Sequence, residues 1–296
     1  MTREPCHKGN TDFRLPSWLK RKKDLAGLHD LKVWLRKASL STVCEEARCP
    51  NILECFSRPT ATFMIMGDIC TRRCCFCSVK KGLPGPIDTN EPARVARAAY
   101  ELGLDHIVIT SPTRDDLEDQ GARHFAQTIQ EIHSLGKNIS VEVLTPDFKG
   151  DRDLLDIVLD AKPEVFNHNV ETISRLQHSI RPGASFETSL DLLRWAHQSG
   201  KNIAVKSGFM VGLGEKEEEI VRLIYELHDA GCDIITIGQY MQPSMHEMRP
   251  VKYWPPDKFR QWKDLAKRIP VGYIVSGPLV RSSFQAKQAL EGLRTR

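Results

Sequence analysis

The chain has 296 residues, of which 41% are hydrophobic, and a formal net charge of +4. These values predict a globular protein with a sizeable core, organised as one main domain with extensions, and no apolar run approaches the ~20 residues of a membrane span. The chain starts MTREPCHKGN, which is not a signal-peptide pattern, so we expect a reducing, cytoplasmic location without membrane association.

Positive charge is concentrated near the N-terminus. Residues 14–37 carry eight Lys or Arg against two Asp, a local excess of six that is larger than the net charge of the whole chain. Either a solvated amphipathic terminus or a surface for an acidic partner explains this excess. Nucleic acid is not expected as a partner, because no aromatic-rich basic stripe accompanies the charge.

Six of the nine cysteines fall into two closely spaced triads, Cys44-x4-Cys49-x5-Cys55 and Cys70-x3-Cys74-x2-Cys77. Each triad can hold three corners of a [4Fe–4S] cluster, and since such a cluster normally takes four cysteine ligands, one iron would keep an open position. Structural zinc is the weaker interpretation, because zinc sites usually pair two C-x2-C half-sites and only the last two cysteines of the second triad have that spacing. Disulfides would suit a short secreted chain better than this one.

The other three cysteines are not expected to bind metal. Cys232 leads into the apolar run IITIG and is expected to be a small buried residue. Cys6 lies in the N-terminal segment, and Cys75 is interpreted as an intervening residue of the second triad.

Past the second triad, β-rich and helical segments alternate at about 30 to 35 residues, the length of a βα unit. Strands are predicted at 60–67, 105–111, 139–145, 163–170, 202–212, 233–241 and 271–277. Helices are predicted from apolar residues at three- and four-residue spacing at 92–103, 122–136, 151–161, 185–200 and 215–231. This alternation predicts an α/β fold with a parallel sheet and outer helices, specifically a partial (β/α)6-type TIM barrel over 61–278. Residues 1–60 and 279–296 are interpreted as extensions that cover the barrel mouth.

Polar residues recur where each predicted strand ends. They are Ser111 and Arg114, Glu142 and Thr145, Asn167, Asn169 and Glu171, Lys206 and Ser207, and Gln239, Gln242 and Ser244. A solvated loop would also be polar, but repetition at the same end of every unit favours a site at the C-terminal face of a barrel.

The segment GDICTRRCCFC resembles the C-x3-C-x2-C motif of the radical S-adenosylmethionine (SAM) superfamily. The resemblance implies that Cys70, Cys74 and Cys77 hold a [4Fe–4S] cluster whose fourth iron is chelated by the amino and carboxylate groups of SAM, with Phe76 beside the adenine. A low-potential cluster in contact with the sulfonium can inject one electron, break a C–S bond and yield a 5′-deoxyadenosyl radical that abstracts hydrogen from an alkyl carbon.

Longer strings resemble the lipoyl synthase family across nearly the whole chain. VCEEARCPNILECF is similar to its auxiliary-cluster motif, which implies that Cys44, Cys49 and Cys55 are ligands. SGPLVRSSF is similar to its Arg-Ser-Ser-Tyr/Phe signature, in which a serine is the fourth ligand; the match points to Ser283, with Ser282 as the alternative. Further matches are LPSWLKR, RDDLEDQGARHF, VFNHNVET, RPGASF, KSGFMVGLGE and QYMQPS. The chain departs from the family at Pro112, Gln120 and Glu247, none of which is a cluster ligand.

The resemblance implies insertion of two sulfur atoms, at C6 and C8 of an octanoyl group that is amide-linked to a lysine of a carrier-protein domain, of the 2-oxoacid dehydrogenase E2 or glycine cleavage H type. The auxiliary cluster would give up the sulfur, and a low-potential donor would supply electrons. An oxygen ligand such as Ser283 is easier to release than a thiolate, and Arg281 beside it is expected to stabilise the charge that develops as iron leaves.

By their position near the ends of predicted strands, Asn169, Glu171, Lys206 and Ser207 are expected to contact the ribose or methionyl part of SAM. Arg181 is expected to pair with a carboxylate. Two alternatives remain open. One is another radical SAM sulfur-insertion enzyme, such as a biotin synthase, which lacks the upstream C-x4-C-x5-C, or a methylthiotransferase. The other is a non-catalytic two-cluster electron-transfer protein, which would not bind SAM.

Overall fold

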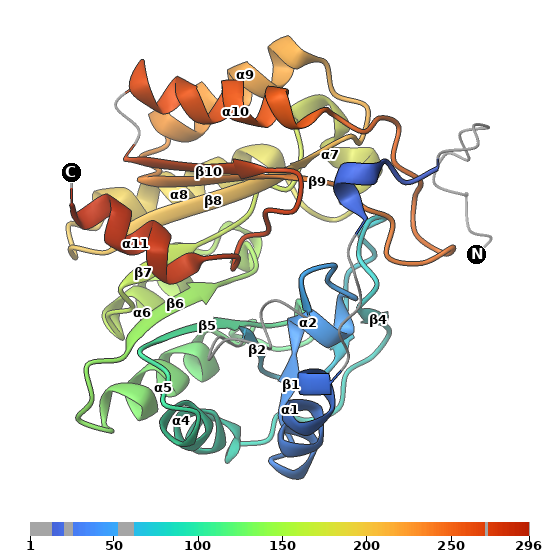
Figure 1. Cartoon of the computed structure of the whole chain (residues 1–296). Helices are drawn as coiled ribbons and strands as arrows, with labels where there is room; N and C mark the ends of the chain where they lie inside the picture. Colours follow the sequence, from blue (N-terminus) through green and yellow to red (C-terminus); the bar gives the residue numbers. More distant parts are fainter. Residues whose placement is uncertain (1–13, 21–25, 53–61, 270–271, 296) are drawn as a thin grey trace.

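The computed structural model describes residues 14–20, 26–52, 62–269 and 272–295, and an eight-stranded sheet lies at its centre (Figure 1). The strands, in spatial order, are β1 (Ser41–Thr42), β2 (Thr62–Met64), β5 (His106–Thr110), β6 (Ser140–Leu144), β7 (Val165–Asn167), β8 (Ala204–Val211), β9 (Ile234–Gln239) and β10 (Tyr273–Gly277). All neighbours from β2 to β10 pair in parallel, and β1 pairs antiparallel to β2. The edge strands β1 and β10 do not pair with each other in the described residues. The predicted partial TIM-type barrel is therefore confirmed.

Amphipathic helices cover the outer face of this sheet. They are α4 (Glu91–Glu101), α5 (Ala122–His133), α6 (Arg152–Asp160), α8 (Phe186–Gln198), α9 (Glu217–Asp229) and α10 (Pro256–Asp264). The side chains of Asp151 and Ser185 accept hydrogen bonds from the first turns of α6 and α8, which is why those helices begin there. Among the described residues, no helix combines the length and the apolar character that crossing a membrane requires.

All seven predicted strands and all five predicted helices are confirmed. Within the described part of the barrel, two further helices were not predicted, α7 (Ser174–Ile180) and α10; the helices of the extensions were not predicted either. The first is too short to show a period. The second, PDKFRQWKD, has only Phe259 and Trp262 as buried residues, too few to reveal an apolar stripe.

The bounds of the predicted strand 202–212 are confirmed by β8, but two polar residues were placed wrongly at its end. Lys206 and Ser207 were expected where the strand runs out, and both lie inside β8, which continues to Val211. Glu142 likewise lies in the middle of β6. The glycine at 208 suggests the start of a loop, whereas in the structure it serves a close approach inside the barrel.

The extensions join the barrel at two places. At the N-terminal side, η1 (Ser17–Leu19), α1 (Ala26–Lys37) and α2 (Val43–Glu46) precede the barrel, and β1 adds an edge strand to its sheet. At the C-terminal side, α11 (Ala286–Arg294) packs against β9, β10 and β5, in front of the sheet in Figure 1. The segment between β10 and α11 runs at the barrel mouth, where it meets residues of the site.

Candidate functional site

The second cysteine triad lies in the loop after β2. Cys70 ends the short strand β3 (Ile69–Cys70), which pairs with β4 (Lys80–Lys81). The three thiols are close enough for their charges to interact. Burial raises the pKa of Cys74 and raises the pKa of Cys77 to about 12. Burial therefore disfavours bare thiolates at these two cysteines, and a bound cation would favour the deprotonated form.

Cys70 differs from the other two because backbone donors point at its sulfur. Arg72 N and Thr113 N lie 3.4 and 3.3 Å from Cys70 Sγ and donate to it. Thr113 belongs to the loop that follows β5, so this sulfur is fixed by a neighbouring unit of the barrel.

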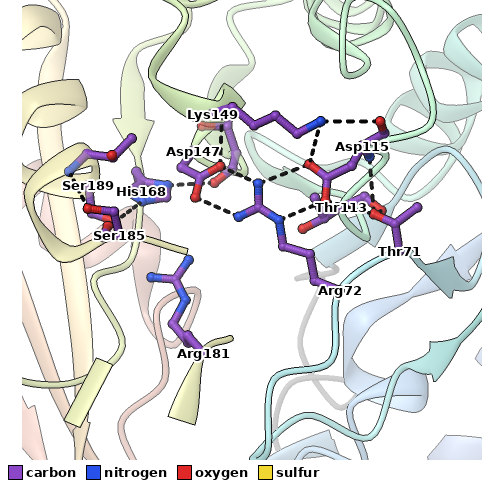
Figure 2. A network of polar contacts seen from close by, with 12 residues as sticks. Thr71, Arg72, Thr113, Asp115, Asp147, Lys149, His168, Arg181, Ser185 and Ser189 are labelled. Carbon is purple, nitrogen blue, oxygen red and sulfur yellow. Dashed lines mark hydrogen bonds and ion pairs between the residues drawn. The ribbon is translucent and has the colours of Figure 1, made fainter. Parts of the chain in front are cut away.

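A network around Arg72 joins the cysteine loop to the loops after β5 and β6 (Figure 2). Arg72 donates four hydrogen bonds to two carboxylates, to Asp115 at 2.9 and 3.0 Å and to Asp147 at 2.6 Å twice. Burial alone would raise the pKa of Asp147, but the guanidinium lowers it to about 2. Sequence analysis gave these three residues no role, and the only available signal was the position of each carboxylate just after a predicted strand.

His168 lies behind Asp147 in the same view (Figure 2). It contacts Thr145 O and Ser189 Oγ, both at 3.0 Å. Burial lowers the pKa of His168 to about 4, so the imidazole is neutral at neutral pH. Since both ring nitrogens are engaged, we regard His168 as a brace between β7 and α8.

An apolar patch flanks the other side of the cysteine loop. Phe76 packs with Ile180, Leu213 and Tyr240, together with Leu176, Met210 and Met248. The backbone of Cys75 fixes this arrangement, since its N–H donates to Ile180 O at 2.9 Å and its carbonyl accepts from Met248 N at 3.0 Å. Phe76 therefore stands in an apolar setting of the kind that a flat base needs.

Polar groups gather where β7 ends, as predicted. Asn169 Nδ2 donates to Glu171 Oε1 at 3.2 Å, and Arg181 Nη1 donates to the carbonyl of Asn169 at 3.1 Å. Glu171 has a left-handed backbone with φ 67°, which costs energy for a residue other than glycine and is typical of functional positions. Burial raises the pKa of Glu171, and Arg181 acts in the opposite direction. Arg181 also acts on Cys74 electrostatically, so this group borders the second triad.

Lys206 and Ser207 do not join that group. Lys206 Nζ donates to both carboxylate oxygens of Glu142, at 2.8 and 3.0 Å, and both side chains are fully buried. Ser207 is the next residue of the strand, so it points to the opposite face of the sheet, between the core residues Val205 and Phe209. The structure therefore gives Lys206 a buried ion pair inside the barrel and places Ser207 on the helix side.

Two cysteines of the first triad lie together after β1. Cys44 is in α2, and Cys49 N donates to Cys44 O at 3.0 Å. A hydrogen bond from the Cys44 side chain lowers the pKa of Cys49 to about 6, and the Arg281 guanidinium acts in the same direction. An easily formed thiolate suits a metal ligand. Cys55 lies outside the described residues.

The segment after β10 runs from the first triad to the polar residues at the end of β7. Asn51 Nδ2, close to Cys49 in sequence, donates to Leu279 O at 2.6 Å. A Cβ on Gly238 would collide with Val280 O, so glycine is required in β9 for this segment to lie on the sheet.

The next residues of that segment face both cysteine sites. Burial lowers the pKa of Arg281, whereas the electrostatic effect of Cys49 and Glu171 acts in the opposite direction. Ser282 Oγ donates to Asn169 Oδ1 at 2.7 Å, an interaction that sequence analysis missed. Ser283 follows, half-buried, in a turn closed by Phe284 N and Arg281 O. Because the Ser282 hydroxyl is engaged elsewhere, Ser283 is the better candidate for the ligand beside Cys49.

The donor sets fit iron–sulfur clusters better than single ions. No group of three or more His, Cys, Asp or Glu side chains in the described part of the chain is arranged to hold one metal ion. In a cubane each thiolate binds its own iron, so the thiols surround the group without converging on a point. Three half-buried thiols with N–H donors on one sulfur match that requirement at the second triad.

Comparisons with known families agree on a single family. The radical SAM superfamily matches residues 64–227, and the N-terminal domain of lipoyl synthase of the radical SAM family matches residues 2–49. A lipoyl synthase from Rubrobacter xylanophilus is 50% identical over 280 residues, which cover 94% of this chain and 87% of that protein. A lipoyl synthase from Aquifex aeolicus is 46% identical over 263 residues, 89% of this chain and 95% of that protein.

Solved structures share the fold at low sequence identity. HydG, a maturase of the [FeFe]-hydrogenase, matches with a TM-score of 0.60 at 13% identity, over 78% of this chain and 53% of that one. Methylornithine synthase (PylB) matches with a TM-score of 0.55 at 14% identity, over 68% of this chain and 60% of that one. These likenesses support the partial barrel alone.

Proposed function

This chain belongs to the lipoyl synthase family of the radical SAM superfamily, and from that premise we propose how its residues share the reaction. The protein is a sulfur-insertion enzyme that uses SAM and two [4Fe–4S] clusters and acts on a lipoyl-carrier protein. The observation that carries the proposal is the path of the segment after β10, which contacts Asn51, close to Cys49, through Leu279 O and contacts Asn169, beside Glu171, through Ser282 Oγ. Sulfur insertion needs a hydrogen-abstracting centre and a sulfur source close to one alkyl chain, and this segment connects the two.

The second triad is the SAM-side site. Cys70, Cys74 and Cys77 would hold one cluster and leave an iron open to the amino and carboxylate groups of SAM. When bound, the two clusters and SAM supply one-electron cleavage of a C–S bond for hydrogen abstraction, and the sulfur that is inserted at C6 and C8.

The residues around this triad bind and orient SAM. Phe76, in its apolar patch, offers a face for the adenine. Asn169 and Glu171, held together at 3.2 Å, offer an amide and a carboxylate to the ribose or the methionyl amine. Arg181, which already acts on Cys74, faces the carboxylate as a charged donor.

The first triad is the sulfur-donating site. Cys44, Cys49 and Cys55 would hold the auxiliary cluster, with Ser283 as the fourth and weakest ligand. Arg281, two residues before Ser283 and within electrostatic reach of Cys49, stabilises negative charge at this site. A serine oxygen gives the cluster one bond that opens more readily than a bond to a thiolate.

The carrier partner is an octanoylated lysine on a domain of the 2-oxoacid dehydrogenase E2 or glycine cleavage H type, and a low-potential protein donates the electrons. The basic residues of 14–37 provide a surface for an acidic partner. We place the reaction in the cytoplasm, where thiols stay reduced.

An anaerobic assay with an octanoyl-lysine peptide tests the proposal. Reconstituted protein should contain about eight iron and eight sulfide per chain, cleave SAM, and convert the peptide to its lipoyl form. The triple change Cys44→Ala, Cys49→Ala and Cys55→Ala should halve the iron and abolish sulfur transfer but still produce 5′-deoxyadenosine. The matched control is Cys232→Ala, at a buried cysteine with no proposed role, which should retain both products. Equal loss of both products in the triple variant would make the first triad structural, and about four iron in the unaltered protein would refute the two-cluster assignment.

A further inference from the structure

The loop that carries the second triad is joined to the loop after β5 by a ladder of contacts. Cys70 Sγ accepts from Thr113 N at 3.3 Å, and Thr71 N donates to Thr113 O at 3.0 Å. Asp115 N donates to Thr71 Oγ1 at 3.1 Å. Arg72 completes the ladder by donating to both oxygens of the Asp115 carboxylate, at 2.9 and 3.0 Å. The contacts alternate along both segments, so the two loops are held in one register.

The same guanidinium also reaches the loop after β6 (Figure 2). Arg72 Nη1 and Nη2 each donate to an oxygen of Asp147 at 2.6 Å, and Asp147 Oδ1 accepts from Lys149 N at 3.0 Å. Phe148 and Lys149 have left-handed backbones, with φ 45° and 49°, a conformation that persists only when the surroundings hold it. Arg72 is thus a rigid, doubly forked bridge across three loops.

We infer that Arg72, Asp115 and Asp147 are positioning residues that hold two backbone N–H groups on Cys70 Sγ and thereby set the reduction potential of the cluster at the second triad. The inference rests on the proposed function, which makes Cys70 a cluster ligand. Reduction adds one negative charge to the cluster, and hydrogen bonds to its sulfurs stabilise the more negative form, which raises the potential. The direction of a backbone N–H group depends on how the two loops are aligned. The residues that fix this alignment therefore also fix the hydrogen bonds to Cys70 Sγ.

The net charge of the network around Arg72 does not explain a change in the reduction potential equally well. Lys149 Nζ lies 3.6 Å from Asp115 Oδ1, so two cations and the carboxylates of Asp115 and Asp147 balance within the network. The network thus adds no net charge near Cys70, whereas its N–H groups point directly at the sulfur.

A proline at position 113 removes one of these donors directly. The ladder uses only backbone atoms of Thr113, so Thr113→Ala is the matched control that keeps the N–H. The measurement is an anaerobic redox titration of the reconstituted full-length enzyme, followed by the EPR signal that changes when SAM is added. Thr113→Pro should lower the equilibrium constant for one-electron reduction at least about tenfold, a shift of 59 mV for a one-electron couple. Thr113→Ala should stay within about twofold of the unaltered protein.

A second pair of variants keeps the test decisive where the proline prevents cluster assembly. Arg72→Lys keeps the charge but cannot form two forks, so it should also lower the reduction constant while the iron content stays near that of the unaltered protein. Its control is Arg73→Lys at the neighbouring exposed arginine, which should change nothing. A SAM-responsive signal whose potential is unchanged in both Thr113→Pro and Arg72→Lys overturns this inference and leaves the proposed function standing. Unaltered protein without any SAM-responsive signal overturns the proposed function itself.

Discussion

The buried pair of Lys206 and Glu142 predicts a stability cost that depends on whether one or both charges are removed. In Lys206→Met, the Glu142 carboxylate keeps only Asn167 Nδ2 at 2.9 Å and a nitrogen of His106 at 4.0 Å. Removing one partner of a buried ion pair costs about 3–5 kcal/mol, because the other charge stays buried without compensation. Glu142→Leu should cost a similar amount for the same reason. The double variant should cost only about 1–3 kcal/mol, because the pair is replaced by apolar side chains and only Asn167 loses its acceptor.

Anaerobic urea unfolding of the cluster-loaded protein, followed by circular dichroism, measures all three variants. Arg175→Met, at the solvent-facing pair with Glu219, is the control and should cost less than ~1 kcal/mol. Additive costs in the double variant, or single costs below ~1 kcal/mol, would refute the reasoning. SAM affinity of the double variant gives an independent check. It should be unchanged, since the ammonium of Lys206 is committed to Glu142; a specific loss of SAM binding would return Lys206 to the binding site.

Three further predictions concern the C-terminal segment and the Arg72 network. Ser282→Ala should weaken SAM binding about fivefold by calorimetry, because Asn169 loses a hydrogen bond of ~1 kcal/mol, whereas Ser283→Ala should leave it within twofold; equal effects would contradict the geometry. Asp147, whose folded-state pKa is about 2 against an ordinary 3.8, should contribute about 2 kcal/mol of stability above pH 4 that is lost as the pH falls through 2. Asp147→Asn should remove that part of the pH dependence of urea unfolding in cluster-free protein. Gly238→Ala should displace the C-terminal segment and abolish sulfur transfer while 5′-deoxyadenosine is still formed, and retention of lipoyl product would show that the segment can move aside.

The strands and most helices of the barrel were predictable because their signals are local. Parallel strands are buried on both faces, so runs such as HIVIT and IITIG are mostly apolar and buried throughout. The positions of Lys206 and Ser207 inside β8 were not predictable in the same way. Its glycines at 208 and in the following loop are typical of a turn, yet a Cβ at Gly208 would overlap Thr236 Oγ1 and touch Asn169 Oδ1. The reason for that glycine lies in residues distant along the chain, which no local pattern reveals.

In the candidate site too, residues with a local sequence signal could be predicted, and residues whose partners are distant along the chain could not. The cysteine triads could be recognised because cluster ligands on one loop have a fixed spacing, although Cys55 lies outside the described residues. Arg72 could not be recognised, since its carboxylate partners lie 43 and 75 residues further along the chain and arginines after a cysteine are common on surfaces. The family resemblance favoured Ser283 over Ser282, and the contact of Ser282 with Asn169 is a second, structural reason for that choice.

Arg281 links the two halves of the site by a simple electrostatic argument. Burial disfavours its charged form, whereas Cys49 and Glu171 favour it electrostatically. Thiolate charge at the first triad therefore helps to hold the C-terminal segment against the barrel. The same segment orders Asn169 through Ser282. Since a favourable coupling between two sites acts in both directions, loading of the first triad should tighten SAM binding at the second, and bound SAM should in turn stabilise the segment that closes the sulfur-donating site.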